Sequence, residues 1–307
     1  MPRIAVLIPC HNEAVAITGV VQSFRAALPE ASIYVYDNNS TDNTVQAAQA
    51  AGARVGHETR QGKGHVVRRM FADIEADIYL LVDGDGTYHA PSAPALIAHL
   101  TNNQLDMVTG VRVHQAQAAY RPGHVLGNVL LTGLVSRLFG ARLGDMLSGY
   151  RVFSRRFVKS FPALAGGFET ETEFTVHALQ LGMPVGELPT PYVERPAGSA
   201  SKLRTYRDGA RILRLILLLV KDERPIPFFS GLAALLFILG IILGTPVVIH
   251  FLHTGLVPRL PTALAATALV LLSFLSLACG LILDSVARGR REMKRLAYLA
   301  IPRGADA

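Results

Sequence analysis

The sequence has no tryptophan, only two cysteines and few charged residues for a length of 307 residues. Cys10 and Cys279 are the only thiols, so the chain has no disulfide framework. It contains neither the Gly-x-Gly-x-x-Gly fingerprint nor a P-loop lysine motif, which argues against the usual dinucleotide and P-loop sites. A basic groove interleaved with aromatic residues is also missing, so we expect no nucleic-acid partner.

Hydrophobic residues make up 50% of the chain and charged residues 17%, a balance too apolar for a purely soluble protein. Residues 226–252 and 260–283 contain no Asp, Glu, Lys or Arg. At a rise of about 1.5 Å per residue, each stretch can cross a hydrocarbon core of roughly 30 Å. Because only residues 253–259 separate them, the pattern predicts a two-helix transmembrane hairpin.

Cations cluster on both outer flanks of this hairpin. Arginines recur at helical spacing between residues 204 and 214, opposite apolar residues, as is typical of an interfacial helix on anionic lipid. Further cations lie at 288–295, whereas the connecting loop holds Arg259 alone. By the positive-inside rule we expect a multi-pass protein of the inner membrane, with the N-terminal domain and both termini in the cytoplasm.

The first 110 residues alternate short β-rich runs with helical patterns, which predicts βαβ units and a mainly parallel sheet. We expect strands at residues 4–8, 33–36, 54–56 and 78–81. The polar loops that follow these strands leave the same edge of the sheet, where open α/β sheets bind ligands.

Two carboxylates follow the strand at residues 78–81. Asp83 and Asp85 are separated by Gly84, and a glycine on each side of Asp85 lets the backbone turn sharply. Both acids can therefore reach one hard cation that also bridges substrate phosphates. Taken alone, these residues are equally well explained by an ordinary acidic turn.

Four segments together resemble successive motifs of the family-2 glycosyltransferases of the GT-A fold. They are IPCHNE at residues 8–13, DNNSTD at 37–42, DGD at 83–85 and LSGYR at 147–151. The similarity covers residues 3–225 and is greatest to the polyprenyl-phosphate branch, which includes dolichyl-phosphate mannose synthases and bacterial polyprenyl-phosphate glycosyltransferases. It implies a Rossmann-like α/β catalytic domain of GT-A type.

The resemblance also implies roles for individual residues. Asp83 and Asp85 would hold Mg²⁺ or Mn²⁺ on the diphosphate of the donor, and Glu13 and Asp37 would contact its nucleoside. Thr87 departs from relatives that carry a Gln beside the metal, which leaves a third protein contact to the metal open. The predicted nucleotide-sugar site comprises Pro9, Asn12, Glu13, Asp37, Asn39, Asp42, Lys63, Asp83 and Gly84.

The acceptor side is expected in the middle of the chain. A polyprenyl phosphate is already mostly anionic at neutral pH, because the second pKa of a phosphate monoester is about 6, so no dedicated general base is required. It needs fixed cations instead, and arginine forks suit phosphate geometry. We expect Asp85, Asp145 and Arg112 to be catalytic, with Asp145 orienting groups. Arg121, Arg195, Ser201 and Lys202 are predicted at the acceptor phosphate, and Ser148, Glu171 and Glu173 are further candidates.

The sequence therefore predicts a catalytic domain at residues 1–202, an interfacial amphipathic helix at 203–225, two transmembrane helices at 226–285 and a basic cytoplasmic tail at 286–307. The predicted activity is that of a membrane-anchored inverting glycosyltransferase, which moves one sugar from a nucleotide diphosphate sugar to a polyprenyl phosphate. The oligomeric state is open, and a homo-oligomer is compatible with the sequence.

Three alternatives are weighed against this prediction. A processive polysaccharide synthase would use a Gln-x-x-Arg-Trp motif, but the chain has no Trp. A metal-dependent nucleotidyltransferase could use the same acidic pair and would release pyrophosphate. A non-enzymatic membrane scaffold that binds nucleotide sugars is disfavoured because Asp83 and Asp85 are both present.

Overall fold

The computed structural model describes residues 2–114, 133, 144–163, 166–167, 169–193, 218, 221 and 224–302. These residues fall into two compact units. The first comprises Met1–Leu213 together with Lys294–Ala307, and the second comprises Arg214–Met293. The predicted interfacial helix at residues 203–225 lies almost entirely outside the described residues.

The first unit is built on a seven-stranded sheet with the order β3-β2-β1-β4-β6-β5-β7. Strands β1 (Ile4–Cys10), β2 (Ser32–Asp37), β3 (Arg54–His57) and β4 (Ile78–Leu81) pair in parallel, as the alternating pattern predicted. The remaining part of the sheet is mixed. Strand β6 (Arg151–Ser154) runs antiparallel to both of its neighbours, and β5 (Met107–His114) pairs in parallel with β7 (Val185–Tyr192).

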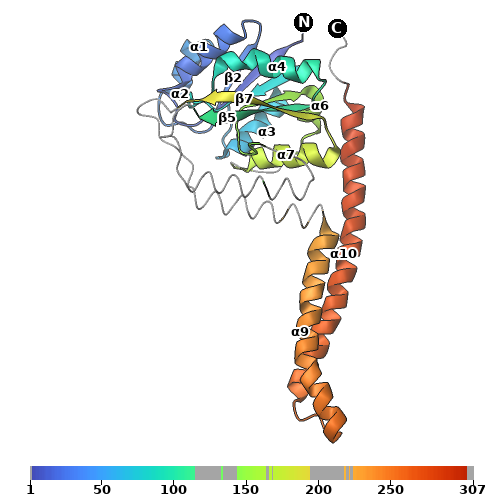
Figure 1. Cartoon of the computed structure of the whole chain (residues 1–307). Helices are drawn as coiled ribbons and strands as arrows, with labels where there is room; N and C mark the ends of the chain where they lie inside the picture. The colour runs from blue at the N-terminus through green and yellow to red at the C-terminus, as the bar shows by residue number, and fades with distance from the viewer. Residues whose placement is uncertain are drawn as a thin grey trace. The chain divides into compact units, whose positions relative to one another are not determined.

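Helices cover both faces of this sheet (Figure 1). One face carries α1 (Ile17–Ala27), α2 (Thr44–Ala50) and α4 (Ala93–Asn102), and the 3₁₀ turn η1 (Ala90–Ser92) precedes α4. The other face carries α3 (Lys63–Asp73), α6 (Arg155–Ser160) and α7 (Thr170–Leu181).

Residues along β1 alternate between the two cores. Val6 and Ile8 belong to the core under α1 and α4, whereas Ala5 and Leu7 belong to the core under α3 and α7. Because side chains in a strand alternate between faces, a continuously apolar strand such as β1 must be buried on both sides. The polar side chains near the ends of these strands are therefore found in the loops.

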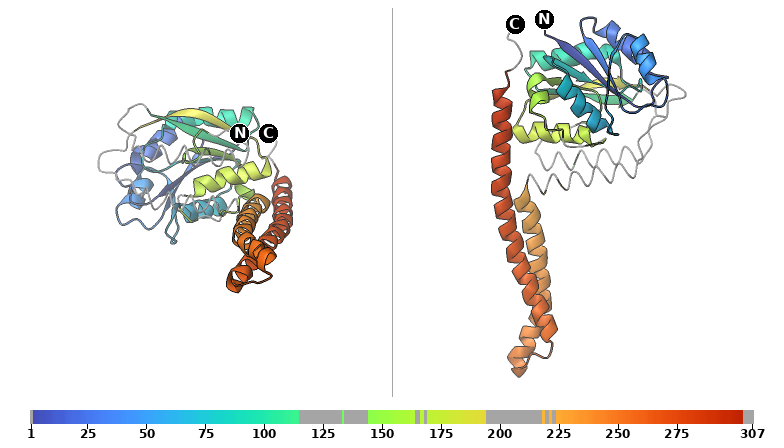
Figure 2. Two further views of the ribbon diagram at one scale, coloured as in Figure 1. Left: turned by 60° about the horizontal axis from the view of Figure 1, so that its bottom comes forward. Right: turned by 180° about the vertical axis from the view of Figure 1, so that it is seen from behind.

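The second unit contains a helical hairpin (Figures 1 and 2). Helix α9 spans Pro225–Thr254, and α10 spans Leu260–Ala300. The two helices approach closely at Gly240, where an added Cβ would lie 2.9 Å from Val270, and Ser276 Oγ donates a hydrogen bond to the carbonyl of Phe229 (3.0 Å). Both helices are long and apolar enough to cross a membrane.

Helix α10 continues without interruption to Ala300, through the residues for which a basic tail was predicted. Its last turns belong to the sheet unit. There Tyr298 Oη donates to Asp106 Oδ2 (2.6 Å), and Arg156 lies over the Tyr298 ring and donates from Nε to the carbonyl of Ile301 (2.7 Å). These contacts hold the last turns of α10 against the sheet domain.

Candidate active site

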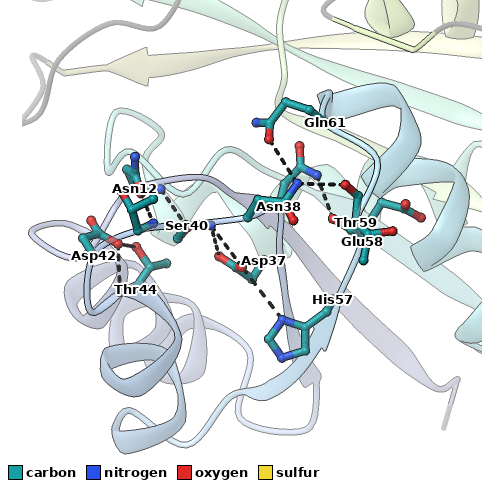
Figure 3. A network of polar contacts seen from close by, with 12 residues as sticks. Asn12, Asp37, Asn38, Ser40, Asp42, Thr44, His57, Glu58, Thr59 and Gln61 are labelled. Carbon is teal, nitrogen blue, oxygen red and sulfur yellow. Dashed lines mark hydrogen bonds and ion pairs between the residues drawn. The ribbon is translucent and has the colours of Figure 1, made fainter.

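The loop after β1 is bound to the loop after β2. Asn12 has a positive φ of 54°, a conformation that Asn tolerates better than most residues. Its N–H donates to Ser40 Oγ (2.8 Å), and its Oδ1 accepts from the N–H of Thr41 (2.7 Å). The N–H of Glu13 likewise donates to Thr44 Oγ1 (2.8 Å). Figure 3 shows the contact between Asn12 and Ser40, and together these hydrogen bonds hold the two loops to each other.

The loop after β2 is bound in turn to the segment after β3. Asn38 is buried, and its Nδ2 donates to the carbonyls of Glu58 and Arg60 (2.8 Å each) (Figure 3). Its Oδ1 accepts from the N–H of Gly62 (2.7 Å). We call the five side chains that link these loops the amide–hydroxyl network: Asn12, Asn38, Asn39, Ser40 and Thr44.

Asp37 and Asp42 lie within this network. Asp37 ends β2 and accepts from the N–H of Ser40, and its Oδ2 is 3.8 Å from Nδ1 of His57, its register partner on β3 (Figure 3). Asp42 Oδ2 accepts from the N–H of Ala14 (3.2 Å). The loop residues predicted for the nucleotide sugar therefore lie together at the carboxyl ends of β1 and β2: Pro9, Asn12, Glu13, Asp37, Asn39 and Asp42.

The acidic loop follows β4, which neighbours β1. An added Cβ at Gly84 would lie 2.5 Å from Cys10 Sγ, so a larger residue would push this loop away from β1. Asp85 is buried, and its Oδ1 accepts from both the N–H (3.1 Å) and Oγ1 (2.7 Å) of Thr87. Thr87 therefore orients one of the two acids.

Asp83 lies beside a buried lysine. Lys63 begins α3, and its Nζ donates to Asp83 Oδ1 (2.5 Å) and to Glu171 Oε1 at the start of α7. The lysine side chain is 9% exposed and that of Glu171 is 5% exposed, whereas that of Asp83 is 30% exposed. Glu171 Oε2 is buried and has no hydrogen-bond partner within the described part of the chain.

Charge balance in this group depends on burial. Burial on its own lowers the pKa of Lys63, but the charges of Asp83 and Glu171 outweigh it and raise this pKa above its ordinary value. Burial raises the pKa of Glu171, the nearby Lys63 opposes that rise, and Asp83 adds to it. The cluster thus places one cation between two acids, and Glu171 is the more strongly desolvated of the two.

The LSGYR segment packs against this cluster. The N–H of Gly149 donates to Tyr88 Oη (2.8 Å), and an added Cβ at Gly149 would lie 2.5 Å from Asp83 Oδ2 and 3.1 Å from Lys63 Nζ. Ser148 is fully buried, and its Oγ donates to the carbonyl of Gly110 (2.6 Å). The structure therefore gives Ser148 a contact that holds the loop, and it places Gly149 against the acid.

Arg151, which the sequence analysis did not propose as a site residue, organises the same loop. It is fully buried, and its guanidinium donates to the carbonyls of Met146 (2.5 Å) and Ser148 (3.0 Å) and to Thr175 Oγ1 on α7 (3.0 Å). Burial lowers the pKa of Arg151 to about 10. Arg151 is the last residue of the LSGYR motif, so the sequence contained a signal for it. Only the fold shows that its side chain points into the core.

A second charged pair joins Arg112 on β5 to Asp145, which precedes the LSGYR segment. Arg112 and Asp145 form a two-pronged ion pair, with Nε to Oδ2 at 2.6 Å and a terminal nitrogen to Oδ1 at 2.9 Å. The guanidinium also lies over the ring of Tyr192, 5.6 Å from its centroid. Burial acts against its charge, but Tyr88 and Asp145 raise the pKa of Arg112 above its ordinary value. Asp145 thus holds the guanidinium of Arg112 in one orientation.

The acids fit a cation that is shared with a substrate. Among the residues that the structure describes, no group of three or more His, Cys, Asp or Glu side chains could hold a metal. Mg²⁺ is usually bound by one or two carboxylates together with substrate phosphates. Asp83 and Asp85 supply two carboxylates on one short loop, so they meet that requirement with a diphosphate.

The remaining predicted residues are Glu173 and four that the structure does not describe. Glu173 is buried one turn along α7, and its N–H donates to the carbonyl of Glu169 (3.0 Å). The residues predicted at the acceptor phosphate lie outside the described residues: Arg121, Arg195, Ser201 and Lys202.

Comparisons with known proteins agree with this geometry. The family model described as Glycosyl transferase family 2 matches residues 5–161. The glycosyltransferase AglJ of Haloferax volcanii is 34% identical over 74% of this chain and 75% of its own length. A dolichyl-phosphate hexose transferase of the same organism is 27% identical over 72% of this chain and 95% of its own length.

A solved structure shares the fold. Glucosyl-3-phosphoglycerate synthase from Mycobacterium tuberculosis, in complex with Mn²⁺, uridine diphosphate and glucosyl-3-phosphoglycerate, aligns with a TM-score of 0.58 at 25% identity. The alignment covers 72% of this chain and 79% of the synthase. The fold class predicted from the sequence, an α/β domain followed by two apolar helices, is confirmed.

Proposed function

Because this chain belongs to glycosyl transferase family 2 and has a GT-A fold, we propose that it transfers one sugar from a nucleotide diphosphate sugar to a polyprenyl phosphate. One observation carries the proposal. The acidic pair, a buried lysine and the polar loops after β1 and β2 meet at one edge of the sheet, in a chain that also has two helices apolar enough to cross a membrane.

The donor is assigned to the loops at that edge. Asp37 and Glu13 contact the nucleoside in this proposal, and Asp83 and Asp85 hold Mg²⁺ or Mn²⁺. When bound, the cation neutralises the negative charge of the departing diphosphate. The Mn²⁺ and uridine diphosphate named for the mycobacterial synthase support a donor of this chemical class.

The acceptor is assigned to the side of Arg112. The dolichyl-phosphate hexose transferase among the relatives supports a lipid phosphate, and an apolar tail of this kind accounts for a membrane hairpin in the same chain. In this proposal Arg112, held by Asp145, bridges toward the donor, and Arg121, Arg195, Ser201 and Lys202 surround the acceptor phosphate. The acceptor needs no general base because a phosphate monoester is already largely ionised at neutral pH.

The test is turnover with defined substrates. Membranes that contain the full chain are incubated with a panel of radiolabelled nucleotide sugars and a polyprenyl phosphate, and labelled lipid is extracted. We expect one donor to give a lipid-linked monosaccharide, and Asp85→Asn to lower kcat by about a hundredfold or more because a metal contributes several kcal/mol to transition-state stabilisation. Undiminished turnover by Asp85→Asn in the presence of a chelator would contradict the metal assignment.

The division between donor and acceptor has its own test. Arg195→Ala and Lys202→Ala should each weaken acceptor binding by about 1.5–3 kcal/mol, the contribution of a hydrogen bond to a charged group. Donor and acceptor are titrated separately. A collapse of donor affinity with an unchanged acceptor KM would place these residues on the nucleotide side.

The orientation in the membrane is part of the proposal. The sheet domain and both termini are assigned to the cytoplasmic side, and the short loop between α9 and α10 to the opposite side. In a cysteine-free background, a cysteine introduced by Thr254→Cys should react with an impermeant reagent added from outside, and one introduced by Ala305→Cys should not. The reverse labelling would overturn this assignment.

A further inference from the structure

The cluster of Lys63, Asp83 and Glu171 contains one more acid than the proposed metal site uses. Asp83 belongs to the acidic loop, whereas Glu171 comes from α7 and is 108 residues away from Lys63 in the chain. The same ammonium group donates to both acids. A cation that binds Asp83 must therefore compete with Lys63 for that carboxylate.

The burial of the Glu171 carboxylate is energetically costly. Its carboxylate has one oxygen on Lys63 and one buried oxygen without a hydrogen-bond partner within the described part of the chain. Leaving a buried acceptor unpaired costs about 1–3 kcal/mol, more for a charged group. A helix start favours acids, but an exposed acid would satisfy the helix dipole without this cost.

We infer that Glu171 is a positioning residue for the metal site, acting through Lys63. Before the cation binds, the single positive charge of Lys63 is shared between both acids. When the cation takes Asp83, Lys63 remains paired with Glu171, so no buried ammonium is left without an anionic partner. This inference rests on the proposed metal-dependent transfer and adds the residue that makes Asp83 available.

The surrounding geometry allows this exchange. Asp83 is the more exposed acid of the pair, at 30% against 5% for the side chain of Glu171, so an entering cation reaches Asp83 first. Gly149 closes the other side of Asp83, since an added Cβ there would lie 2.5 Å from Oδ2. Asp83 can therefore exchange its partner while its own position is kept.

The experiment measures Mn²⁺ binding to the full-length protein in detergent. Free and bound Mn²⁺ are separated by electron paramagnetic resonance, with Mn²⁺ alone and with Mn²⁺ plus uridine diphosphate. Glu171→Gln should weaken Mn²⁺ binding about tenfold, because Lys63 then has Asp83 as its only anionic partner. Glu75→Gln removes an acid that precedes β4, on the opposite edge of the sheet, and should leave Mn²⁺ binding unchanged.

A double variant separates the action through Lys63 from a direct attraction between Glu171 and the metal. In Lys63→Met/Glu171→Gln no lysine competes for Asp83, so Mn²⁺ affinity should return to at least that of the unmodified protein. This variant also leaves no buried unpaired charge, which keeps the test valid if a single variant folds poorly.

Each outcome has a separate meaning. Equal Mn²⁺ affinity in Glu171→Gln and the unmodified protein, or a double variant that binds as weakly as Glu171→Gln, would overturn the inference and leave the proposed function intact. A lack of Mn²⁺ binding to the unmodified protein in the presence of uridine diphosphate and of guanosine diphosphate would instead contradict the proposed function itself.

Discussion

The two halves of the candidate site are held by different forces. After β1, β2 and β3, most bonds from one loop to the next come from neutral amides and hydroxyls, as in the bonds from Asn38 to Glu58 and Arg60, and the carboxylate of Asp42 adds one to Ala14. Around β4 and β5, ion pairs link the segments, as in Lys63–Asp83 and Arg112–Asp145. A neutral hydrogen bond contributes about 1 kcal/mol and carries no net charge. In an ion pair, by contrast, each charged group can bind a different partner of opposite charge.

This difference fits the proposed substrates. A nucleoside needs a preformed, largely neutral surface, whereas a diphosphate, a metal and an acceptor phosphate bring charges that must find partners. The amide–hydroxyl network therefore defines a shape, and the charged half can respond to what binds. Substitutions that affect one half and spare the other test this distinction.

The largest effect is expected from Gly149→Ala in the charged half. The new Cβ would lie 2.5 Å from Asp83 Oδ2, so the acid and its lysine must shift. Because a displacement of about 1 Å at a reacting centre can cost a factor of about 10², kcat should fall about a hundredfold. Gly19→Ala on α1, where nothing lies within 4 Å of an added Cβ, is the control and should keep full turnover.

Arg151→Met should lower the free energy of unfolding by about 3 kcal/mol. It leaves two buried carbonyls and the hydroxyl of Thr175 without their donor, each at a cost of about 1–3 kcal/mol. Thermal unfolding of the full chain in detergent measures the change. Arg69→Met, which removes an exposed pair with Asp73, is the control and should leave the free energy of unfolding nearly unchanged. Equal losses in the two variants would show that Arg151 has no special role.

Asn38→Leu tests the neutral half and should lower the free energy of unfolding by about 2 kcal/mol. The substitution keeps the size of the side chain and removes three hydrogen bonds at once. Donor KM should rise with it, while Mn²⁺ affinity stays unchanged because no charge is altered. Asn103→Ala on the exposed end of α4 is the matched control. A loss of Mn²⁺ binding in Asn38→Leu would mean that the two halves are not independent.

The smallest effect concerns pH and the far end of α7. His177 is buried between Phe157 and Phe161, and burial, with the nearby Lys294, lowers its pKa to about 3. Its stabilising contribution as a neutral ring is therefore fully present above its ordinary pKa of 6.5 and is lost as pH falls from there toward 3.

Between pH 7.5 and 5.5 this loss amounts to about 1 kcal/mol. Unfolding of the full chain measured across this range should show it, and His177→Phe should remove this part of the slope. His99→Phe on α4 should retain it. An unchanged slope in His177→Phe would assign the pH dependence to other groups.

The placement of the neutral half could largely be predicted from the sequence, because it depends on patterns of neighbouring residues. A short apolar run followed by a polar loop predicts a strand end, and parallel strands bring such ends to one edge. Pro9, Asn12, Glu13, Asp37, Asn39 and Asp42 accordingly lie where they were expected. The charged half was harder, because its partners come from distant segments, as with Lys63 and Glu171.

By itself the sequence determined the class of the protein. Its alternating strands and helices, its acidic pair after a buried strand and its two uncharged apolar runs follow from periodicity and composition, which are properties of neighbouring residues. Only the tertiary structure decided that Arg151 points into the core, that Gly149 lies against Asp83 and that Lys63 is shared between two acids. The physical reason is that burial and charge pairing depend on which distant segments pack together, and an isolated pattern does not record that choice.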